Sequence, residues 1–304
     1  MPTDLIESRN ILVTGGCGFI ASHLVNHLVS KYPHYTIVNL DKLDYCASLQ
    51  NVSASVDAPN YRFVQGDVCS ADLVRHVLAS ERIDTVIHAA AQSHVDNSWG
   101  NSLAFTTNNV IGTHMLVEAA KAAGVHRFIH VSTDEVYGSC DDTERRTERS
   151  TLDPCNPYAA SKAGAEAIVK SYYNSYKFPA IITRGNNVYG PHQYPEKIIP
   201  RFISRLLNGL PCELHGTGTN RRHFVHVDDV VTAFDLILHK GEVGEVYNIG
   251  SDDEFENIEI ARKLVALLKP GCETDTHIEH VVDRPFNDVR YYLSYDKLSR
   301  LGWA

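Results

Sequence analysis

Short apolar runs rich in β-branched residues alternate with helical stretches through the first half of the chain, and this alternation limits the possible folds most. The runs expected as strands are Asn10–Thr14, Tyr35–Leu40, Tyr61–Val64, Thr85–His88, Arg127–Val131 and Ala180–Thr183. The stretches expected as helices are Gly18–Ser30, Ala71–Ser80, Ser102–Ala123 and Tyr158–Tyr176. Continuous apolar strands separated by helices are typical of a parallel sheet covered on both faces, so the sequence predicts an α/β fold with a doubly wound parallel sheet.

The pattern becomes irregular after about residue 185. The stretches NNVYGPHQYPEK and LHGTGTNRR are rich in Asn, Gly and Pro and are expected to be loops. A helix that starts at Asp228–Asp229, a strand at Glu245–Ile249 and a helix at Ile258–Leu268 interrupt the irregular sequence. We therefore expect two domains: residues 1–185 with returning segments at about 223–250, and a smaller α/β lobe of residues 186–222 and 251–304.

Composition excludes several classes of protein. Of 304 residues, 43% are hydrophobic and 21% are charged, which is typical of a globular protein and not of a disordered one. With 28 Lys and Arg against 37 Asp and Glu, the net charge of −9 repels phosphate backbones, so no nucleic-acid partner is expected. The sequence has no run of about 18 apolar residues, so no membrane span is expected.

The cysteines, the histidines and the first residues bear on location and on metals. The seven cysteines contain no C-x-x-C pair, and MPTDLIESRN has no apolar core of a signal peptide, so reduced thiols and a cytoplasmic location are expected. The sixteen histidines form no H-E-x-x-H or comparable cluster, so no metal site is expected.

The first strand leads directly into a glycine-rich turn. Residues 14–21 read T-G-G-C-G-F-I-A, which places G-x-x-G-x-x-A between a strand and a helix. A glycine has no Cβ, so a pyrophosphate can approach the backbone at the helix N-terminus, where free N–H groups favour negative charge. This context indicates a Rossmann-like dinucleotide site, and the turn residues expected to contact the cofactor are Gly15, Gly18, Phe19 and Ile20.

Further cofactor contacts are expected where the later strands end. Asp41 closes the second strand 23 residues after Gly18. Its carboxylate suits ribose hydroxyls and repels a 2′-phosphate, which favours NAD over NADP although Lys42 adjoins it. Asp67, followed by Val68, ends the third strand and suits the adenine amino group, or it caps the next helix. The small residues after the fourth strand admit a flat cofactor or serve packing alone: Ala89, Ala90 and Ala91.

Tyr158 and Lys162 form a Y-x-x-x-K pair on one helix face. An ammonium group beside the phenol is expected to lower the phenol pKa, which makes Tyr158 a candidate base, and Lys162 is also a candidate for the cofactor ribose. Tyr173 and Lys177 match the same pattern. We expect them to be an exposed pair, because only Tyr158 follows Asn–Pro at a helix start and lies downstream of a hydroxyl pair, Ser132–Thr133, that ends the fifth strand.

Two adjacent acids, Asp134 and Glu135, come directly after that strand. Open α/β sheets bind ligands at the carboxyl edge, so these acids and Thr133 are expected in the site and not in a solvated turn. Paired carboxyl groups with differently tuned pKa values can supply one acid and one base. An enzyme that only oxidises an alcohol needs neither, whereas one that also eliminates water needs both.

The motifs together resemble the extended short-chain dehydrogenase/reductases, and most closely the nucleoside-diphosphate-glucose 4,6-dehydratases. The matching stretches cover nearly the whole chain and are TGGCGFIASH, NLDKLDYC, HAAAQSHVDNS, VSTDEVYG, NPYAASKAGAE, RGNNVYGPHQYPEKIIPRF, YNIG and DRPFNDVRY. The STDEVYG run discriminates best, because related sugar epimerases usually lack the Asp–Glu pair.

The resemblance implies a redox-neutral dehydration with NAD. In it, Tyr158 takes the O4 proton of the glucose while C4 gives up hydride, Thr133 hydrogen-bonds near O4, and Lys162 tunes Tyr158. Glu135 then removes the C5 proton and Asp134 protonates the departing C6 hydroxyl. Hydride returns to C6 and yields a 4-keto-6-deoxy sugar nucleotide.

The resemblance also implies substrate contacts and a partner. The residues expected to contact the sugar or the nucleotide are Ser93, His94, Thr133, Asn187, Lys197, Ile198, Arg222, Asn257, Arg284 and Asn287. The alternative for these residues is a purely structural role. The smaller lobe would therefore bind the sugar nucleotide. A homodimer with a four-helix interface of Ser102–Ala123 and Tyr158–Tyr176 is expected. The chain ends at Ala304, where similar enzymes continue with further helical sequence, so we expect that lobe to be incomplete at its C-terminus.

One departure from the family bears on the substrate. Bacterial thymidine-linked enzymes usually read D-R-P-G-H-D where this chain reads D-R-P-F-N-D over residues 283–288. That form is similar to the UDP-glucose 4,6-dehydratases that begin UDP-rhamnose synthesis, so UDP-glucose is favoured over dTDP-glucose. An NAD-dependent epimerase or oxidoreductase, and a non-catalytic NAD-binding regulator, are the alternatives.

Overall fold

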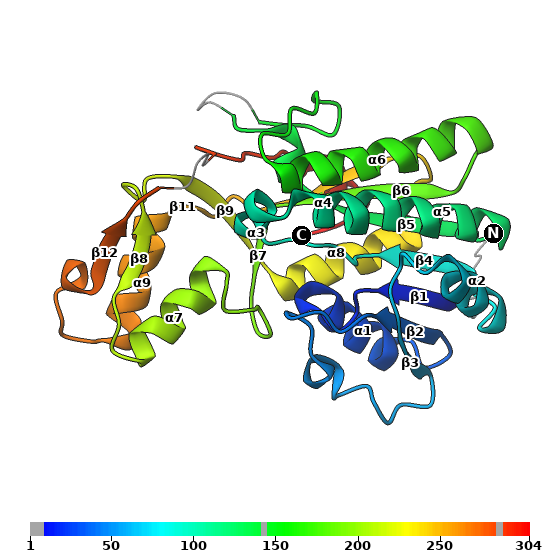
Figure 1. Cartoon of the computed structure of the whole chain (residues 1–304), viewed down its shortest axis with the longest axis horizontal. Helices are drawn as coiled ribbons and strands as arrows, with labels where there is room; N and C mark the ends of the chain where they lie inside the picture. Colours follow the sequence, from blue (N-terminus) through cyan, green and yellow to red (C-terminus); the bar gives the residue numbers. More distant parts are fainter. Residues whose placement is uncertain (1–8, 141–144, 284–287) are drawn as a thin grey trace.

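The computed structural model describes residues 9–140, 145–283 and 288–304, and its largest element is a seven-stranded parallel sheet (Figure 1). The strand order is β10-β6-β5-β4-β1-β2-β3, and every neighbouring pair is parallel. The strands are β1 (Asn10–Thr14), β2 (Thr36–Asp41), β3 (Tyr61–Gln65), β4 (Thr85–His88), β5 (Arg127–Thr133), β6 (Ala180–Gly185) and β10 (Val246–Ile249). The predicted parallel sheet is therefore confirmed.

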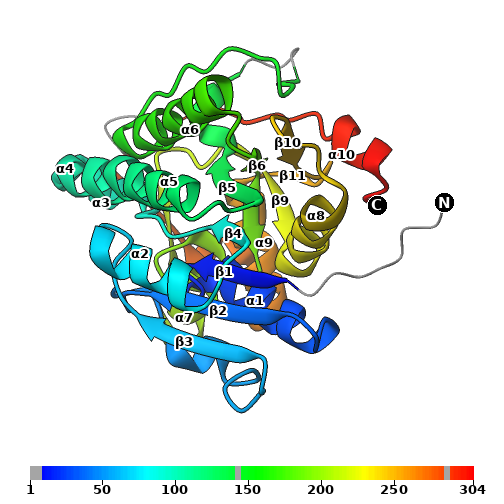
Figure 2. The same ribbon diagram turned by 90° about the vertical axis from the view of Figure 1, so that its right-hand side faces the viewer.

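Helices cover both faces of this sheet (Figure 2). On one face lie α1 (Phe19–Lys31) and α8 (Val227–Lys240), and on the other α2 (Ala71–Ser80), α5 (Gly112–Ala122) and α6 (Pro157–Tyr176). Successive strand residues belong to the two apolar cores in turn: Ile11 and Val13 pack toward α1, and Leu12 packs toward α2 and α5. Burial on both faces explains why each strand reads as a continuous apolar run.

A smaller group of elements lies beside one end of the large sheet (Figure 1). It holds a three-stranded sheet, β11-β9-β7, a two-stranded sheet, β12-β8, and the helices α7 and α9. The elements are β7 (Asn187–Tyr189), α7 (Ile198–Leu207), β8 (Cys212–His215), β9 (Arg221–His226), β11 (Glu254–Glu256), α9 (Asn257–Leu268) and β12 (Ile278–Val281). The division of the chain into two domains stays a prediction, which these separate sheets and cores support.

Two expectations about secondary structure were wrong in part. The two stretches predicted to be loops contain β7 and parts of β8 and β9, because these strands are short and their polar residues hide the apolar pattern, and α7, which lies between the stretches, was not predicted. The helix expected at Ser102–Ala123 consists of α4 (Ser102–Phe105), a π-helical segment (Thr106–Ile111) and α5. Buried Asn109 in that segment bonds to Gln92 and to Ser161 on α6, and these contacts hold the irregular turn against α6. The remaining short elements are η1 (Leu49–Val52), α3 (Val95–Gly100), η3 (Asp134–Tyr137), η4 (Thr274–His277) and α10 (Asp296–Leu301).

A buried ion pair joins α6 to β6. Arg184 donates from Nη2 to Oε2 of Glu166 at 2.6 Å and from Nε to Oε1 at 2.9 Å, and both side chains are fully buried. Arg184 also donates to the Tyr137 hydroxyl at 2.7 Å, and that hydroxyl donates to Asn248 on β10 at 2.8 Å. The pair therefore holds η3, which carries the two acids, against two strands of the large sheet, β6 and β10, and against helix α6.

The substitution Glu166→Gln is expected to lower the free energy of unfolding by about 3 kcal/mol or more, because it leaves a buried guanidinium without its counter-charge. Urea unfolding followed by circular dichroism measures the change. The matched control is Asp72→Asn, which breaks an exposed pair with Arg75 and is expected to cost about 1 kcal/mol or less. If both variants lost the same free energy of unfolding, the conclusion that the buried Glu166–Arg184 pair stabilises the fold would be wrong.

Candidate active site

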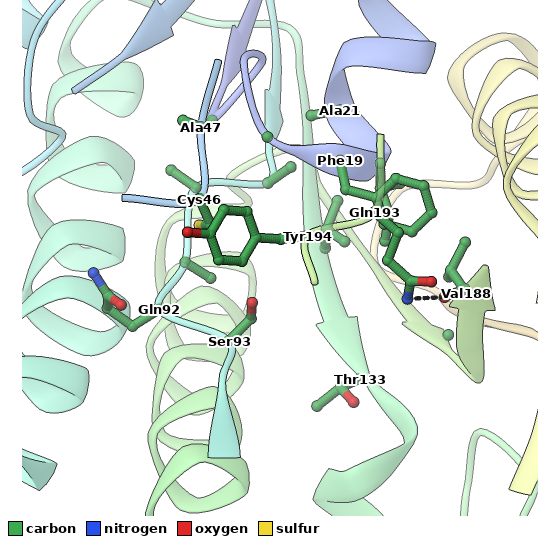
Figure 3. Close-up of a pocket in the computed structure, with 18 of the residues that line it drawn as sticks. Phe19, Ala21, Cys46, Ala47, Gln92, Ser93, Thr133, Val188, Gln193 and Tyr194 are labelled. Carbon is green, nitrogen blue, oxygen red and sulfur yellow. Dashed lines mark hydrogen bonds between the residues drawn. The ribbon is translucent and has the colours of Figure 1, made fainter. Parts of the chain in front are cut away.

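A cavity of about 370 Å³ lies at the carboxyl ends of the parallel strands, where open α/β sheets bind ligands. Its walls come from the segments after β1, β2, β3 and β4, from the start of α6 and from residues 185–188 and 193–199. Figure 3 shows Phe19, Ser93, Thr133 and Tyr194, from four separate parts of the chain, around this space. One cavity thus collects most of the predicted site residues.

The glycine-rich turn has the conformation that its sequence predicts. Gly15 has φ +73°, and a Cβ on it would lie 2.8 Å from the Cα of Ala90, so no larger residue fits. Gly18 precedes the first turn of α1 and supplies no side-chain cap, so the first N–H groups of this helix have no side-chain partner there. The two glycines, Phe19 and Ile20 all line the cavity beside Ala89, Ala90 and Ala91.

The acids after β2 and β3 line the same cavity, but Asp41 also has a structural role. Its carboxylate accepts hydrogen bonds from the backbone N–H groups of Cys17 at 2.9 Å and Leu43 at 2.7 Å, which fix the glycine turn against β2. A carboxylate has about four acceptor positions, so capacity for ribose hydroxyls remains. Asp67 does not cap α2, whose N-cap is Ser70. Lys42 lies 3.1 Å from Asp44 and 3.9 Å from Asp67, and Val68 completes this part of the wall.

Thr133, Glu135, Tyr158 and Lys162 line the cavity at the end of β5, whereas Asp134 lies behind this wall and is 2% exposed. β5 runs through Thr133, two residues further than expected, and so carries the hydroxyl directly to the cavity. The acids then fall on the single 3-10 turn η3, which turns one carboxyl to the cavity and buries the other.

Two asparagines that the sequence did not single out hold the acids in place. Asn186 donates to Oδ2 of Asp134 at 2.8 Å. Asn156 donates to Oε2 of Glu135 at 2.9 Å, and its own Oδ1 accepts the N–H of Ala159, which makes it the N-cap of α6. The Asn–Pro pair is a recognised signal for a helix start, so the start of α6 was predictable. The contact of the Asn156 side chain with Glu135 was not predictable.

Both carboxyl groups have raised pKa values. Burial, followed by the charge of Glu135, raises the pKa of Asp134 from 3.8 to about 7, and the bonds from Asn186 and Thr133 oppose this shift. Burial also raises the pKa of Glu135, while Asn156, Lys197 and Arg222 oppose the shift. Two neighbouring carboxyl groups that ionise reluctantly can share the parts of acid and base near neutral pH.

The pKa of Tyr158 differs from the expectation. It lies above the ordinary value for a phenol, because of burial and then the charge of Glu135, and the group that lowers it is the Thr133 hydroxyl through a hydrogen bond. Lys162 donates to the carbonyl of Val131 at 2.6 Å, and burial lowers its pKa to about 8. In the protein alone, the expected activation of Tyr158 by Lys162 is therefore not found.

The other predicted residues separate into three groups. Ser93, Asn187, Lys197 and Ile198 line the cavity, and Lys197 donates to the carbonyl of Ser93 at 2.9 Å. The residues that do not line it are His94, Arg222 and Asn257. Arg222 instead stacks on Tyr291, 4.9 Å from the ring centroid, and its charge lowers the pKa of both acids. Arg284 and Asn287 lie outside the described residues.

The second Y-x-x-x-K pair is remote from this cavity. Lys177 has φ +55° and ends α6, with its Nζ 5.8 Å from the ring centroid of Tyr173. In the described ranges no group of three His, Cys, Asp or Glu is arranged to hold a metal ion. Within the same ranges no helix is both long and apolar enough to cross a membrane.

Comparison with known proteins agrees with this geometry. A family model described as GDP-mannose 4,6 dehydratase matches residues 12–304. A trifunctional UDP-glucose 4,6-dehydratase/UDP-4-keto-6-deoxy-D-glucose 3,5-epimerase/UDP-4-keto-L-rhamnose-reductase of Arabidopsis thaliana is 54% identical over 98% of this chain and 45% of its own length. A dTDP-D-glucose 4,6-dehydratase of Mus musculus is 52% identical over 97% of this chain and 84% of its own. The chain thus spans less than half the length of the plant relative.

A solved structure is similar over nearly the whole chain. It is a dTDP-glucose 4,6-dehydratase from Streptomyces venezuelae with NAD and TYD bound, with 43% identity and a TM-score of 0.92. The match covers 97% of this chain and 91% of that one.

The raised pKa of Asp134 predicts a pH-dependent cost to folding. The folded state binds the proton of the Asp134 carboxyl group more tightly than the unfolded state does. The stability that this proton contributes is therefore lost as pH rises from about 4 to about 7. Asp134→Asn cannot ionise, so its free energy of unfolding should rise relative to the parent protein across that range, by a few kcal/mol at about 1.4 kcal/mol per pKa unit. Urea titrations at a series of pH values measure the difference, with exposed Asp57→Asn as the control. A pH-independent difference would contradict the burial argument.

Proposed function

We propose that this chain, which belongs to the GDP-mannose 4,6-dehydratase family, converts a nucleoside-diphosphate glucose to its 4-keto-6-deoxy derivative with NAD as a resident cofactor. The family expected from the STDEVYG motif is confirmed. The observation that carries the proposal is a carboxyl pair with raised pKa values, placed beside Tyr158 at the end of β5. An oxidoreductase without elimination has no use for that pair.

The cavity fits a dinucleotide. The turn at Gly15 and the start of α1 suit a pyrophosphate, and Asp41 suits a ribose. Lys42 is held by Asp44 and Asp67, so it is not set aside for a 2′-phosphate, which supports NAD over NADP. When bound, NAD supplies the means to accept hydride from C4 of the sugar and to return it to C6, and its positive ring favours ionisation of nearby acids.

The chain's own groups would handle the protons. Tyr158 takes the proton of O4, assisted by Thr133, whose hydrogen bond stabilises the phenolate. The resulting ketone acidifies C5–H, and Glu135, held by Asn156, removes that proton. Asp134, whose pKa of about 7 leaves it largely protonated below neutrality, supplies the proton for the departing C6 hydroxyl, which requires its carboxyl to turn from behind the cavity wall toward the bound sugar.

The nucleotide remains a proposal of its own. The D-R-P-F-N-D sequence favours UDP-glucose over dTDP-glucose, although four of its residues lie outside the described ranges. Relatives that act on each nucleotide have nearly equal identity to this chain. A route toward rhamnose-type sugars and a cytoplasmic location are parts of the same proposal.

Purified protein saturated with NAD should form 4-keto-6-deoxy product from UDP-glucose, and more slowly from dTDP-glucose. Tyr158→Phe and Glu135→Gln should each reduce kcat by about 10²-fold or more, because each removes a proton-transfer group. Tyr173→Phe, from the second Y-x-x-x-K pair, is the control and should keep full activity. Product is measured by the absorbance of the 4-keto sugar in alkali and by mass spectrometry. No such product from either nucleotide would refute the dehydratase, and full activity of Glu135→Gln would favour an epimerase.

We also propose the homodimer that the family resemblance implies, with α4, α5 and α6 at its interface. α5 and α6 lie side by side (Figure 2), and Leu103 and Ile111 expose 77% and 44% of their surface on the same helical region. Burial of such side chains against a second copy would remove apolar surface from water.

Sedimentation at micromolar concentration should show a dimer, and Leu103→Glu combined with Ile111→Glu should shift it to monomer with unchanged circular dichroism. The control is Leu267→Glu on α9, which is 75% exposed but outside the proposed interface and should leave the dimer intact. A monomeric parent protein would refute the proposal.

A further inference from the structure

We propose that the Thr133 hydroxyl passes a proton from Tyr158 to Asp134 between turnovers, so that the enzyme restores its own base and acid without a proton from solvent. The inference rests on the proposed dehydration and adds to it a second role for Thr133. It follows from a proton count over the reaction and from the contacts of one hydroxyl group.

The proton count leaves the two groups in the wrong states after each turnover. Tyr158 has gained the proton of O4, and Asp134 has lost a proton to the water that leaves with the C6 oxygen. The proton that Glu135 removes from C5 returns to C5, and the hydride that leaves C4 returns to C6. Substrate therefore loses one water, and one proton must move from Tyr158 to Asp134 before the next turnover.

Thr133 connects these two groups. Its Oγ1 lies 3.2 Å from Oδ1 of Asp134, and the same hydroxyl hydrogen-bonds to the phenol of Tyr158. The backbone N–H of Glu135 donates to Oγ1 at 3.3 Å. A hydroxyl has one proton to donate and two lone pairs. With one lone pair taken by Glu135, the remaining lone pair and the proton serve Tyr158 and Asp134, in either order.

The transfer needs no change in this arrangement. The O–H bond of Tyr158 breaks as its proton joins the free lone pair of Thr133, and the original Thr133 proton moves to Oδ1 of Asp134. Tyr158 ends as the base and Asp134 as the acid, and no atom other than the two protons has moved. The Thr133 hydroxyl is neutral before and after the step, so no buried charge is left on it.

Among the described residues that contact Asp134, none other than Thr133 could deliver a proton to its carboxyl group. It is 2% exposed, and its Oδ2 is held by the amide of Asn186. An amide N–H donates a hydrogen bond but does not pick up a second proton under ordinary conditions, so Asn186 does not conduct one. Thr133, which lines the cavity while Asp134 does not, is the hydroxyl in contact with this acid.

The test compares Thr133→Val, which keeps the shape of the side chain but removes the hydroxyl, with Thr133→Ser, which keeps the hydroxyl. Steady-state turnover of the valine variant should fall about 10²-fold or more. It should then rise with the concentration of imidazole at constant ionic strength, because a small diffusible acid–base replaces the lost path. The serine variant and the parent protein should show no dependence on imidazole, and KM should change less than kcat in the valine variant.

Three results would overturn the relay: valine turnover within threefold of the parent, a reduced valine rate that imidazole does not raise, or a parent rate that itself depends on imidazole. The last measurement needs no variant, so it decides the question even if the valine variant fails to fold, which melting temperature and bound NAD would reveal. Absence of product from the parent protein would refute the proposed dehydration, whereas product formation that is unaffected in the valine variant would refute only the relay.

Discussion

Placing two carboxyl groups side by side in the interior is the constraint on which the rest of the site depends. A buried carboxylate without partners is costly, and two adjacent ones also repel each other. The structure offsets these costs with one amide for each acid, Asn186 for Asp134 and Asn156 for Glu135, and with the more distant charge of Arg222. The compensation is incomplete, and the remaining cost raises both pKa values above those of free carboxyl groups, that of Asp134 to about 7.

The positions of these two asparagines are set by the pairing of the strands and by the start of α6. Asn186 sits at the end of β6, which pairs with β5, so its amide arrives beside Asp134 through sheet register alone. Asn156 caps α6, and the same helix returns Glu166 to the buried pair with Arg184. Because Arg184 also bonds to Tyr137, the turn that carries the acids is held at both ends. Stability and the geometry of the acids therefore share the same contacts.

The sequence predicted what local pattern determines. Strands with continuous apolar residues, the glycine turn and the positions of Asp41, Thr133 and Tyr158 at strand or helix ends follow from periodicity and from the requirement for φ > 0 at Gly15. The sequence did not predict contacts between distant segments. Neither the bond from Asn156 to Glu135, 21 residues away, nor the engagement of Asp41 by the glycine turn has a local signal. The strand β8 was missed because its four residues alternate in burial over too few positions, and β9 was missed because it begins with two half-buried arginines and has only a short buried run.

The difference at Tyr158 shows how far a motif determines chemistry. Y-x-x-x-K places a lysine one turn from the phenol, but the energy of the phenolate depends on every charge around it. Here the carboxyl groups to which the proposed elimination assigns the acid and base roles also disfavour the phenolate, and Lys162 directs its amine to a carbonyl of β5. The acid pair and the base are therefore one coupled system, in which a proton on Asp134 removes a charge that opposes ionisation of Tyr158. A hydroxyl between them is the arrangement through which the two groups can exchange a single proton, and this makes the position of Thr133 as important to the acid as to the base.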